Sequence, residues 1–235
     1  MFPIFEGDTR HVDRFVRELT RLGLPFAAHF DHCSDEFERQ FRSHPLFVAA
    51  HSDRDPESHF DESFRQSALD ILIKEGFEWA VQMDVDETLE RDAPAMLRAI
   101  TEEADTDVAC FPCLDLWGDA RHYRVDGPFA GNQREKVFRL TGNSLVYPHP
   151  TAHAPNVKPL LATKTRATVV RREVRILHWG IMDMQHAQEH RERWDAIYTC
   201  KVGRNPYGGY EYYFDPATVV KMREVPEECL VEDYL

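Results

Sequence analysis

The sequence lacks any apolar run long enough to cross a membrane. None of its hydrophobic stretches approaches the roughly 20 consecutive apolar residues that a spanning helix requires. Residues 1–6 contain neither the basic segment nor the apolar core of a signal peptide. We therefore expect a cytoplasmic protein with no membrane span.

The chain also has little positive charge and few cysteines. Its 28 basic and 41 acidic side chains give a net charge of −13, which does not favour a nucleic-acid partner, because phosphate contacts need an excess of lysine and arginine. A nucleic-acid acceptor would need a local basic patch such as the one in residues 156–175. The five cysteines are odd in number and dispersed, which indicates a reducing compartment rather than a disulfide framework.

No internal repeat and no low-complexity linker divides the 235 residues. A hydrophobic content of 43% is typical of a globular chain and not of a disordered one. We therefore predict a single domain over residues 1–235. Its parts are a first half to residue 104, a second half over 105–200 and an aromatic tail over 201–235.

The first part of the chain alternates helical and strand-like patterns. Apolar residues at helical spacing begin at Val12 and stop before Gly23, and two further helices are expected after Ser34 and Asp61. Strands are expected at residues 25–30, 46–50 and 79–83. This alternation predicts an open, parallel α/β sheet with helices on both faces.

The second part is richer in strand-like segments. A helix is expected after Asp92, and a last helix from Ala187 to Tyr198. The strands expected between them cover residues 108–114, 137–140, 144–147 and 168–177.

The sharpest motif is Asp84-Val85-Asp86-Glu87, directly after the apolar run that ends at Met83. Ligands of a parallel sheet bind beyond the carboxyl ends of its strands, which would place this motif in a cleft. Three carboxylates within four residues repel one another, and a divalent cation such as Mg²⁺ or Mn²⁺ removes that repulsion. The alternative interpretation is a solvated acidic turn that caps the next helix.

Two enzyme families place an Asp-x-Asp at the end of a strand. One comprises the haloacid-dehalogenase-like phosphatases, whose first motif matches residues 84–89 and would make Asp84 a phosphorylated nucleophile. That family also needs a later Ser or Thr and a Lys, for which Thr141 and either Lys158 or Lys164 are candidates. Its final acidic pair is missing, so a magnesium-dependent phosphatase is the alternative function.

The chain more fully resembles the second family, the family 2-like glycosyltransferases of the GT-A fold, over about residues 5–195. The segments that carry the resemblance are Glu6–Gly23, Phe30–Asp35, Phe64–Gln66, Trp79–Glu87, Lys136–Arg139 and Ile176–Gly180. The resemblance implies a Rossmann-like, mostly parallel central sheet with a mixed-strand C-terminal half. It also implies a hexosyltransferase-like enzyme that moves a sugar from a nucleotide-sugar, in our prediction a UDP-sugar, to a hydroxyl acceptor.

The resemblance further implies roles for individual residues. Asp84, Asp86 and His178 would bind Mn²⁺ or Mg²⁺, which neutralises the departing diphosphate. The nucleotide-sugar ligands would be Asp31, Arg65, Asp84 and Lys136. The alternatives are a core histidine at His178, an acid at a helix N-terminus at Asp31, and surface ion pairs at Arg65 and Lys136.

The sequence leaves the catalytic base open. An inverting enzyme needs a carboxylate to take the proton of the acceptor hydroxyl, and the candidates are Asp115 and Asp183, followed by Asp126 and Glu135. Saccharide, lipid-linked and other hydroxyl acceptors all fit. The first strand departs from the family, because Phe5-Glu6-Gly7-Asp8 stands in place of an Arg-Asn-Glu-like tripeptide. A third alternative is therefore a nucleotide-sugar-binding module without catalysis.

Overall fold

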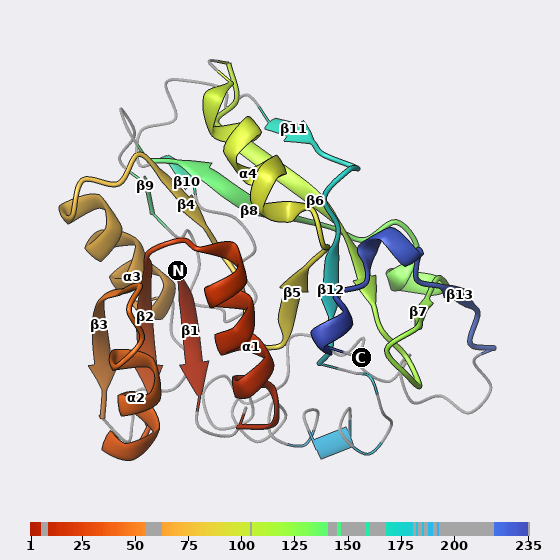
Figure 1. Ribbon diagram of the computed structural model, residues 1–235, viewed down its shortest axis with the longest axis horizontal. Coiled ribbons are helices and arrows are strands. Elements are labelled where there is room, and N and C mark those ends of the chain that lie inside the picture. Colours follow the sequence, from red (N-terminus) through yellow and green to blue (C-terminus); the bar gives the residue numbers. More distant parts are fainter. Residues whose placement is uncertain are drawn as a thin grey trace, which may run out of the picture.

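The computed structural model describes residues 1–5, 9–54, 63–103, 105–140, 145–146, 158–159, 168–180 and 219–234, with the isolated positions 182, 185, 188, 189 and 192. Its first part alternates strands and helices as the sequence predicted (Figure 1). The elements are β1 (Phe2–Phe5), α1 (Thr9–Leu22), β2 (Phe26–Asp31), α2 (Asp35–Arg42), β3 (Phe47–Asp53), α3 (Ser63–Lys74) and β4 (Trp79–Val81).

The helices begin and end where local signals place them. The face of α1 that carries Val12, Phe15 and Leu19 is buried, and Gly23 follows the helix with a φ of 65°, which glycine adopts without steric cost. At the start of α2, the Ser34 hydroxyl accepts a hydrogen bond from the Phe37 N–H at 3.3 Å.

Strands β1, β2 and β3 form a parallel sheet in the order β1-β2-β3. Its central strand is buried along its whole length because helices cover both faces. Ala27 packs in one cluster with side chains of α3, whereas Phe26, Ala28 and Phe30 pack in another with side chains of α1 and α2.

Two hydrogen bonds connect this sheet to the next one. The Met1 amino group donates to the Val81 carbonyl at 2.7 Å, and the Met83 N–H donates to the Met1 carbonyl at 3.2 Å. Met1 is thus hydrogen-bonded to both sequence neighbours of Gln82, which is the hydrogen-bond pattern of parallel strands. The segment that carries β4 therefore runs beside β1, on the side away from β2.

The second sheet is mixed. Its order is β4-β8-β6-β12-β5, with β11 also paired to β6. The additional strands are β5 (Glu87–Leu89), β6 (Val108–Asp115), β8 (Gln133–Arg139), β11 (Thr168–Val170) and β12 (Ile176–His178), and α4 (Ala93–Glu102) lies between β5 and β6. Strand β8 is antiparallel to β4 and β6, whereas β12 is parallel to β6 and antiparallel to β5. The expected parallel order thus holds for β1–β3 and gives way to mixed pairing beyond β4.

The single strand predicted for residues 168–177 is wrong, because the chain forms two strands there. Strand β11 pairs with the start of β6 and β12 with its end. The Arg171 N–H still donates to the Cys110 carbonyl at 2.9 Å, and residues 172–175 leave the ladder after it. Pro112 of β6 lies opposite this break. The Cys113 N–H donates to the Asn132 carbonyl, on the β8 side of β6. Because successive N–H groups of a strand point to opposite sides, an N–H at position 112 would point toward β11 and β12. Proline has no N–H, so β6 offers these strands no donor at this position.

Residues 219–234 pack on the second sheet. Strand β13 (Met222–Glu224) pairs with β7 (His122–Arg124), and the short 3-10 helices η4 (Glu227–Cys229) and η5 (Glu232–Tyr234) follow it. Their side chains join Leu114 and Leu177 in one apolar cluster.

The remaining small elements are β9 (Leu145–Val146), β10 (Lys158–Pro159) and the 3-10 helix η2 (Gly127–Phe129). Strand β9 lies within the strand expected at 144–147. Of the helix predicted at 187–198, the structure describes residues 188, 189 and 192, and all three are helical. The rest of that segment and most of the aromatic tail lie outside the described residues. In the described part of the chain, no helix combines the length and the apolar character of a membrane span.

Candidate functional site

Four strand ends meet at one edge of the second sheet. Strands β6 and β12 end there at Asp115 and His178, which are direct partners in the parallel register. Strand β5 begins at the same edge with Glu87, which is the antiparallel partner of His178. Strand β8 also begins there, because it is antiparallel to β6. The edge therefore collects polar side chains that are far apart in the sequence.

The acidic motif forms a turn that leads into β5. The Glu87 N–H donates to the Asp84 carbonyl at 3.0 Å, and the Asp84 N–H donates to the Glu87 carboxylate at 2.9 Å. The next element is a strand, so the interpretation of this turn as a helix cap is wrong. Glu87 is fully buried, whereas Asp84 and Asp86 are half-buried and lie closer to the surface.

Asp86 and His178 approach each other across two segments. The Asp86 Oδ2 and His178 Nε2 atoms lie 3.2 Å apart, and the Trp179 N–H donates to the Asp86 carbonyl at 2.8 Å. Gly180 completes this contact. A Cβ atom at Gly180 would lie 2.2 Å from Asp86 Oδ2 and 3.0 Å from His178 Nε2, so the arrangement leaves no room for any other residue type.

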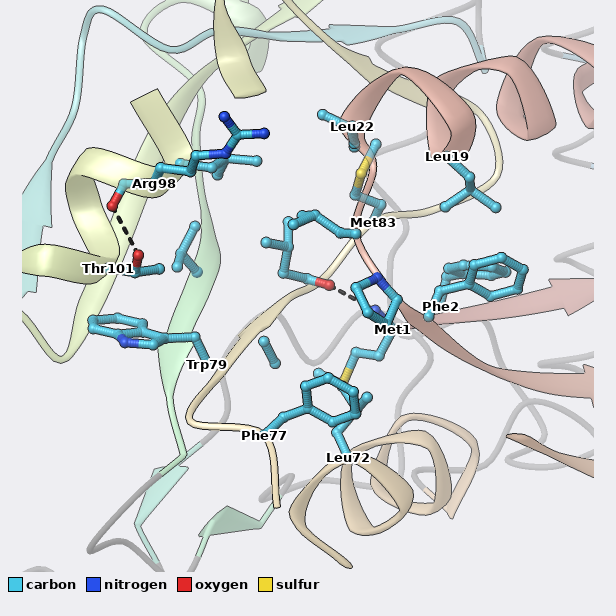
Figure 2. Close-up of a pocket in the computed structure, with 17 residues that line it drawn as sticks. Met1, Phe2, Leu19, Leu22, Leu72, Phe77, Trp79, Met83, Arg98 and Thr101 are labelled. Atoms are coloured by element: carbon cyan, nitrogen blue, oxygen red, sulfur yellow. Dashed lines mark hydrogen bonds between the residues drawn. The ribbon is translucent and has the colours of Figure 1, made fainter. Parts of the chain in front are cut away.

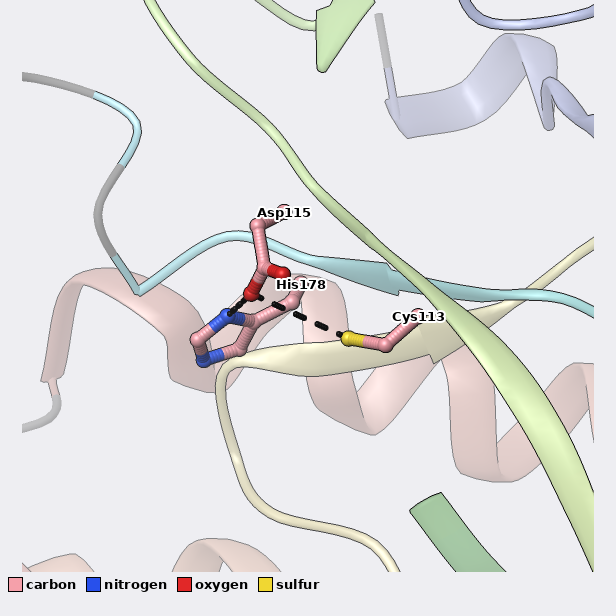
Figure 3. A group of neighbouring side chains, drawn as sticks. All are labelled: Cys113, Asp115 and His178. Atoms are coloured by element: carbon pink, nitrogen blue, oxygen red, sulfur yellow. Dashed lines mark hydrogen bonds and ion pairs between the residues drawn. The ribbon is translucent and has the colours of Figure 1, made fainter. Parts of the chain in front are cut away.

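Asp115 fixes the orientation of the His178 ring (Figure 3). His178 Nδ1 donates to Asp115 Oδ1 at 2.7 Å, and the second Asp115 oxygen accepts from Asn132 at 3.1 Å. Because Nδ1 is used in this way, Nε2 is the nitrogen that faces Asp86. Asp115 is buried to 2% exposure, which fits a residue that orients His178.

Electrostatic contacts at this edge favour a charged His178. Burial and the nearby Arg134 act to lower the pKa of His178, but Asp86 and the Asp115 hydrogen bond outweigh them and raise it to about 9. Burial acts to raise the pKa of Asp115, but the hydrogen bond from His178 and its charge outweigh burial and hold this pKa below the ordinary value.

Two cations neutralise Glu87. Arg134 donates to Glu87 Oε1 at 2.6 Å and lies 3.5 Å from Asp115, and the Lys136 ammonium forms a buried ion pair with Glu87 Oε2. Glu87 therefore acts as an internal counter-ion that holds the turn. The Asp84 and Asp86 side chains are left as the carboxylates nearer the surface.

Cys113 lies beside this group but does not extend it. The Cys113, Asp115 and His178 ligand atoms fall within 4.8 Å of one another, as Figure 3 shows. The Cys113 thiol is buried at the interior end of the group, and burial raises its pKa well above the usual range. A neutral thiol is a poor metal ligand, and Nδ1 of His178 is already bonded to Asp115.

The predicted nucleotide-sugar ligands are distributed over both sheets. Asp31 ends β2 in a buried position, and His32 Nδ1 donates to Asp31 Oδ1 at 2.5 Å. The His32 backbone has a φ of 53°. Lys136 is buried on Glu87 rather than open to a ligand. Arg65 belongs to α3, but its side chain lies outside the described part of the structure. Their roles toward a nucleotide-sugar stay predictions.

The candidate bases have different environments. Asp126 accepts hydrogen bonds from the buried Arg124 guanidinium, and Asp115 is bonded to His178. Glu135 lies between Arg134 and Lys136 on β8 and so points to the opposite face of the strand. Asp183 lies outside the described residues, as do Thr141, Lys164 and the side chain of Lys158, which the phosphatase alternative needs.

Sequence reasoning did not identify Asn132 and Arg134 as site residues. A signal was present, because Asn132, directly before β8, and Arg134 and Lys136 within it are spaced two residues apart and therefore share a face. That pattern indicates a polar cluster but does not name its partners, which come from β5, β6 and β12.

Comparisons with known proteins give only a distant structural likeness. No protein-family model matches the sequence, and no curated protein sequence matches it. Among solved structures, the chain is similar to the crystal structure of S. aureus TarS 1-349, with 12% sequence identity and a TM-score of 0.45. The match covers 72% of this chain and 59% of that chain. A likeness at this level supports no conclusion about activity.

Proposed function

We propose that this chain is a metal-dependent, hexosyltransferase-like glycosyltransferase that moves a sugar from a UDP-sugar to a hydroxyl acceptor. The observation that carries the proposal is the contact of Asp86 Oδ2 with His178 Nε2, 3.2 Å apart where β12 ends and β5 begins. The resemblance to family 2-like glycosyltransferases supports it, as does the parallel β1–β3 sheet with β4 beside β1.

The side chains fit a divalent cation of octahedral preference. Two ligand atoms in adjacent octahedral positions, each about 2.1 Å from the ion, lie about 3 Å apart. The observed separation of Asp86 Oδ2 and His178 Nε2 is close to that value. A set that mixes an imidazole nitrogen with carboxylate oxygens favours Mn²⁺ over Mg²⁺, because Mg²⁺ prefers oxygen ligands. Asp84, at the start of the same turn, is the third proposed ligand.

The chain's own residues prepare this site. Asp115 aims His178 Nε2, and Arg134 with Lys136 neutralises Glu87, so that the turn holds Asp84 and Asp86 in place. A bound Mn²⁺ supplies positive charge to the diphosphate that departs in glycosyl transfer. The nucleotide would lie at the carboxyl end of the parallel sheet, where β2 ends at Asp31.

A binding experiment with a matched variant tests the proposal. Asp86→Asn removes one ligand charge, and Asp92→Asn removes the same charge from an exposed residue that makes no capping hydrogen bond at α4. We expect UDP with Mn²⁺ to stabilise the wild type and Asp92→Asn, by about 2.7 kcal/mol at one hundred times the Kd. Asp86→Asn should show no such stabilisation. Absence of a Mn²⁺-dependent UDP effect in the wild type would contradict the proposal.

Turnover experiments separate the alternatives. Release of UDP from a panel of UDP-sugars is expected with a hydroxyl acceptor present. UDP binding without release across the panel would indicate a binding module. Hydrolysis of a generic phosphate ester that is abolished by Asp84→Asn would instead indicate the phosphatase.

A further inference from the structure

A cavity lies between α1, α3, α4 and the segment that carries β4 (Figure 2). Its volume is about 170 Å³, and all but two of its 17 lining residues are apolar. The two exceptions, Arg98 and Thr101, both come from α4 and lie on the same side of the cavity (Figure 2). Apolar cavities on the order of 150 Å³ stay dry and admit benzene, so this one has room for a single ring or a short branched chain.

The walls of the cavity are firmly held. The Arg139 guanidinium stacks on the Trp79 ring, 4.3 Å from the ring centroid, and donates hydrogen bonds to the Thr106 and Glu103 carbonyls. The opposite wall is formed by Leu19 and Leu22, buried core residues of α1. A cavity between such walls is not closed by a small side-chain movement.

Arg98 gives the cavity one positive charge. Its side chain is exposed, and among the described residues its guanidinium has no hydrogen bond or ion pair. The Thr101 hydroxyl is bonded to the Arg98 carbonyl, which leaves the guanidinium as the charged donor at this side. A planar guanidinium matches a carboxylate in a bidentate manner, and a nearby apolar surface strengthens that pair by excluding water.

We propose that this cavity binds a small carboxylic acid with an apolar body of one ring or one short branched chain, its carboxylate on Arg98 and its body against Trp79 and Met83. The proposal rests on the cavity and not on glycosyl transfer. Met83 directly precedes Asp84, so the ligand would contact the segment that leads into the acidic turn.

The test uses 3-phenylpropionate as the probe, 3-phenylpropionamide as its neutral analogue, and methionine-methyl labelled protein. We expect the Met83 methyl resonance to shift on titration with the acid, and the amide to bind about tenfold more weakly because it lacks the charge. Arg98→Gln should weaken binding of the acid about tenfold and leave binding of the amide unchanged. Arg39→Gln, an exposed arginine of α2, removes the same charge elsewhere and should bind like the wild type.

Three results would overturn the proposal. One is the absence of any Met83 shift at millimolar acid. Another is equal affinity for acid and amide, which would leave an apolar cavity without charge selectivity. The third is an equal effect of Arg98→Gln and Arg39→Gln, which would indicate long-range electrostatics only. Arg98 is exposed, so its substitution is not expected to impair folding.

Discussion

The substitution Gly180→Ala is the sharpest probe of the acidic turn. A Cβ at this position would lie 2.2 Å from Asp86 Oδ2, and real Cβ contacts essentially never fall below 3.0 Å. The Asp86 carboxylate must therefore move by at least 0.8 Å, the difference between these two values. Metal–oxygen distances are fixed to within about 0.2 Å, so a displacement of this size removes Asp86 from the coordination sphere.

We expect Gly180→Ala to lower the affinity for Mn²⁺ by about 10–100-fold, the range typical of residues that position metal ligands. Isothermal titration with Mn²⁺ measures this directly. Gly76→Ala is the control, because its Cβ would meet no atom within 4 Å but its φ of +79° is unfavourable for alanine. That control should lose about 1 kcal/mol of stability and keep its Mn²⁺ affinity. Wild-type Mn²⁺ affinity in Gly180→Ala would refute the assignment of Asp86 as a ligand.

Three further predictions concern the groups around this turn and the core. Asp115→Asn should weaken Mn²⁺ binding about 10–100-fold and lower the pKa of His178, because it removes the carboxylate that accepts from Nδ1. NMR titration of the imidazole measures this pKa, and an unchanged value would contradict the orienting role of Asp115. Because the His178 pKa is raised to about 9, its protonation stabilises the metal-free fold fully below about pH 6.5, and this contribution is lost as the pH rises to 9. Over the same interval Mn²⁺ affinity should rise by about tenfold per pH unit, since the ion must displace the proton; a flat titration would refute this. Glu18→Gln should lower the free energy of unfolding in urea by about 3 kcal/mol, because the buried Glu18 accepts from Leu89, Arg21 and Tyr234, whereas the exposed Glu36→Gln should change little.

Local patterns determined the elements of the first part of the chain. The periodicity of α1, the Ser34 cap and the apolar run before Asp84 are all interactions within a few residues, and each appears in the structure near its predicted bounds. The place of Asp84 and Asp86 beyond a strand was predictable for the same reason.

Pairing between distant strands was not determined by local pattern. The sequence suggested His178 as a metal ligand and left Asp115 among several candidate bases, but only the parallel register of β6 and β12 makes Asp115 the hydrogen-bond partner of His178. The break between β11 and β12 likewise depends on Pro112, which belongs to the neighbouring strand and not to the segment that breaks.

The sequence by itself therefore determined the α/β alternation and the acidic turn, because short-range spacing and capping specify them. The tertiary structure alone decided how the charges of that turn are used. Glu87 is neutralised by Arg134 and Lys136 of β8. Asp86 contacts His178 beside Gly180, which follows β12 and has no Cβ to block the contact. These contacts join residues from different strands, so the strand register fixes them and the local sequence does not.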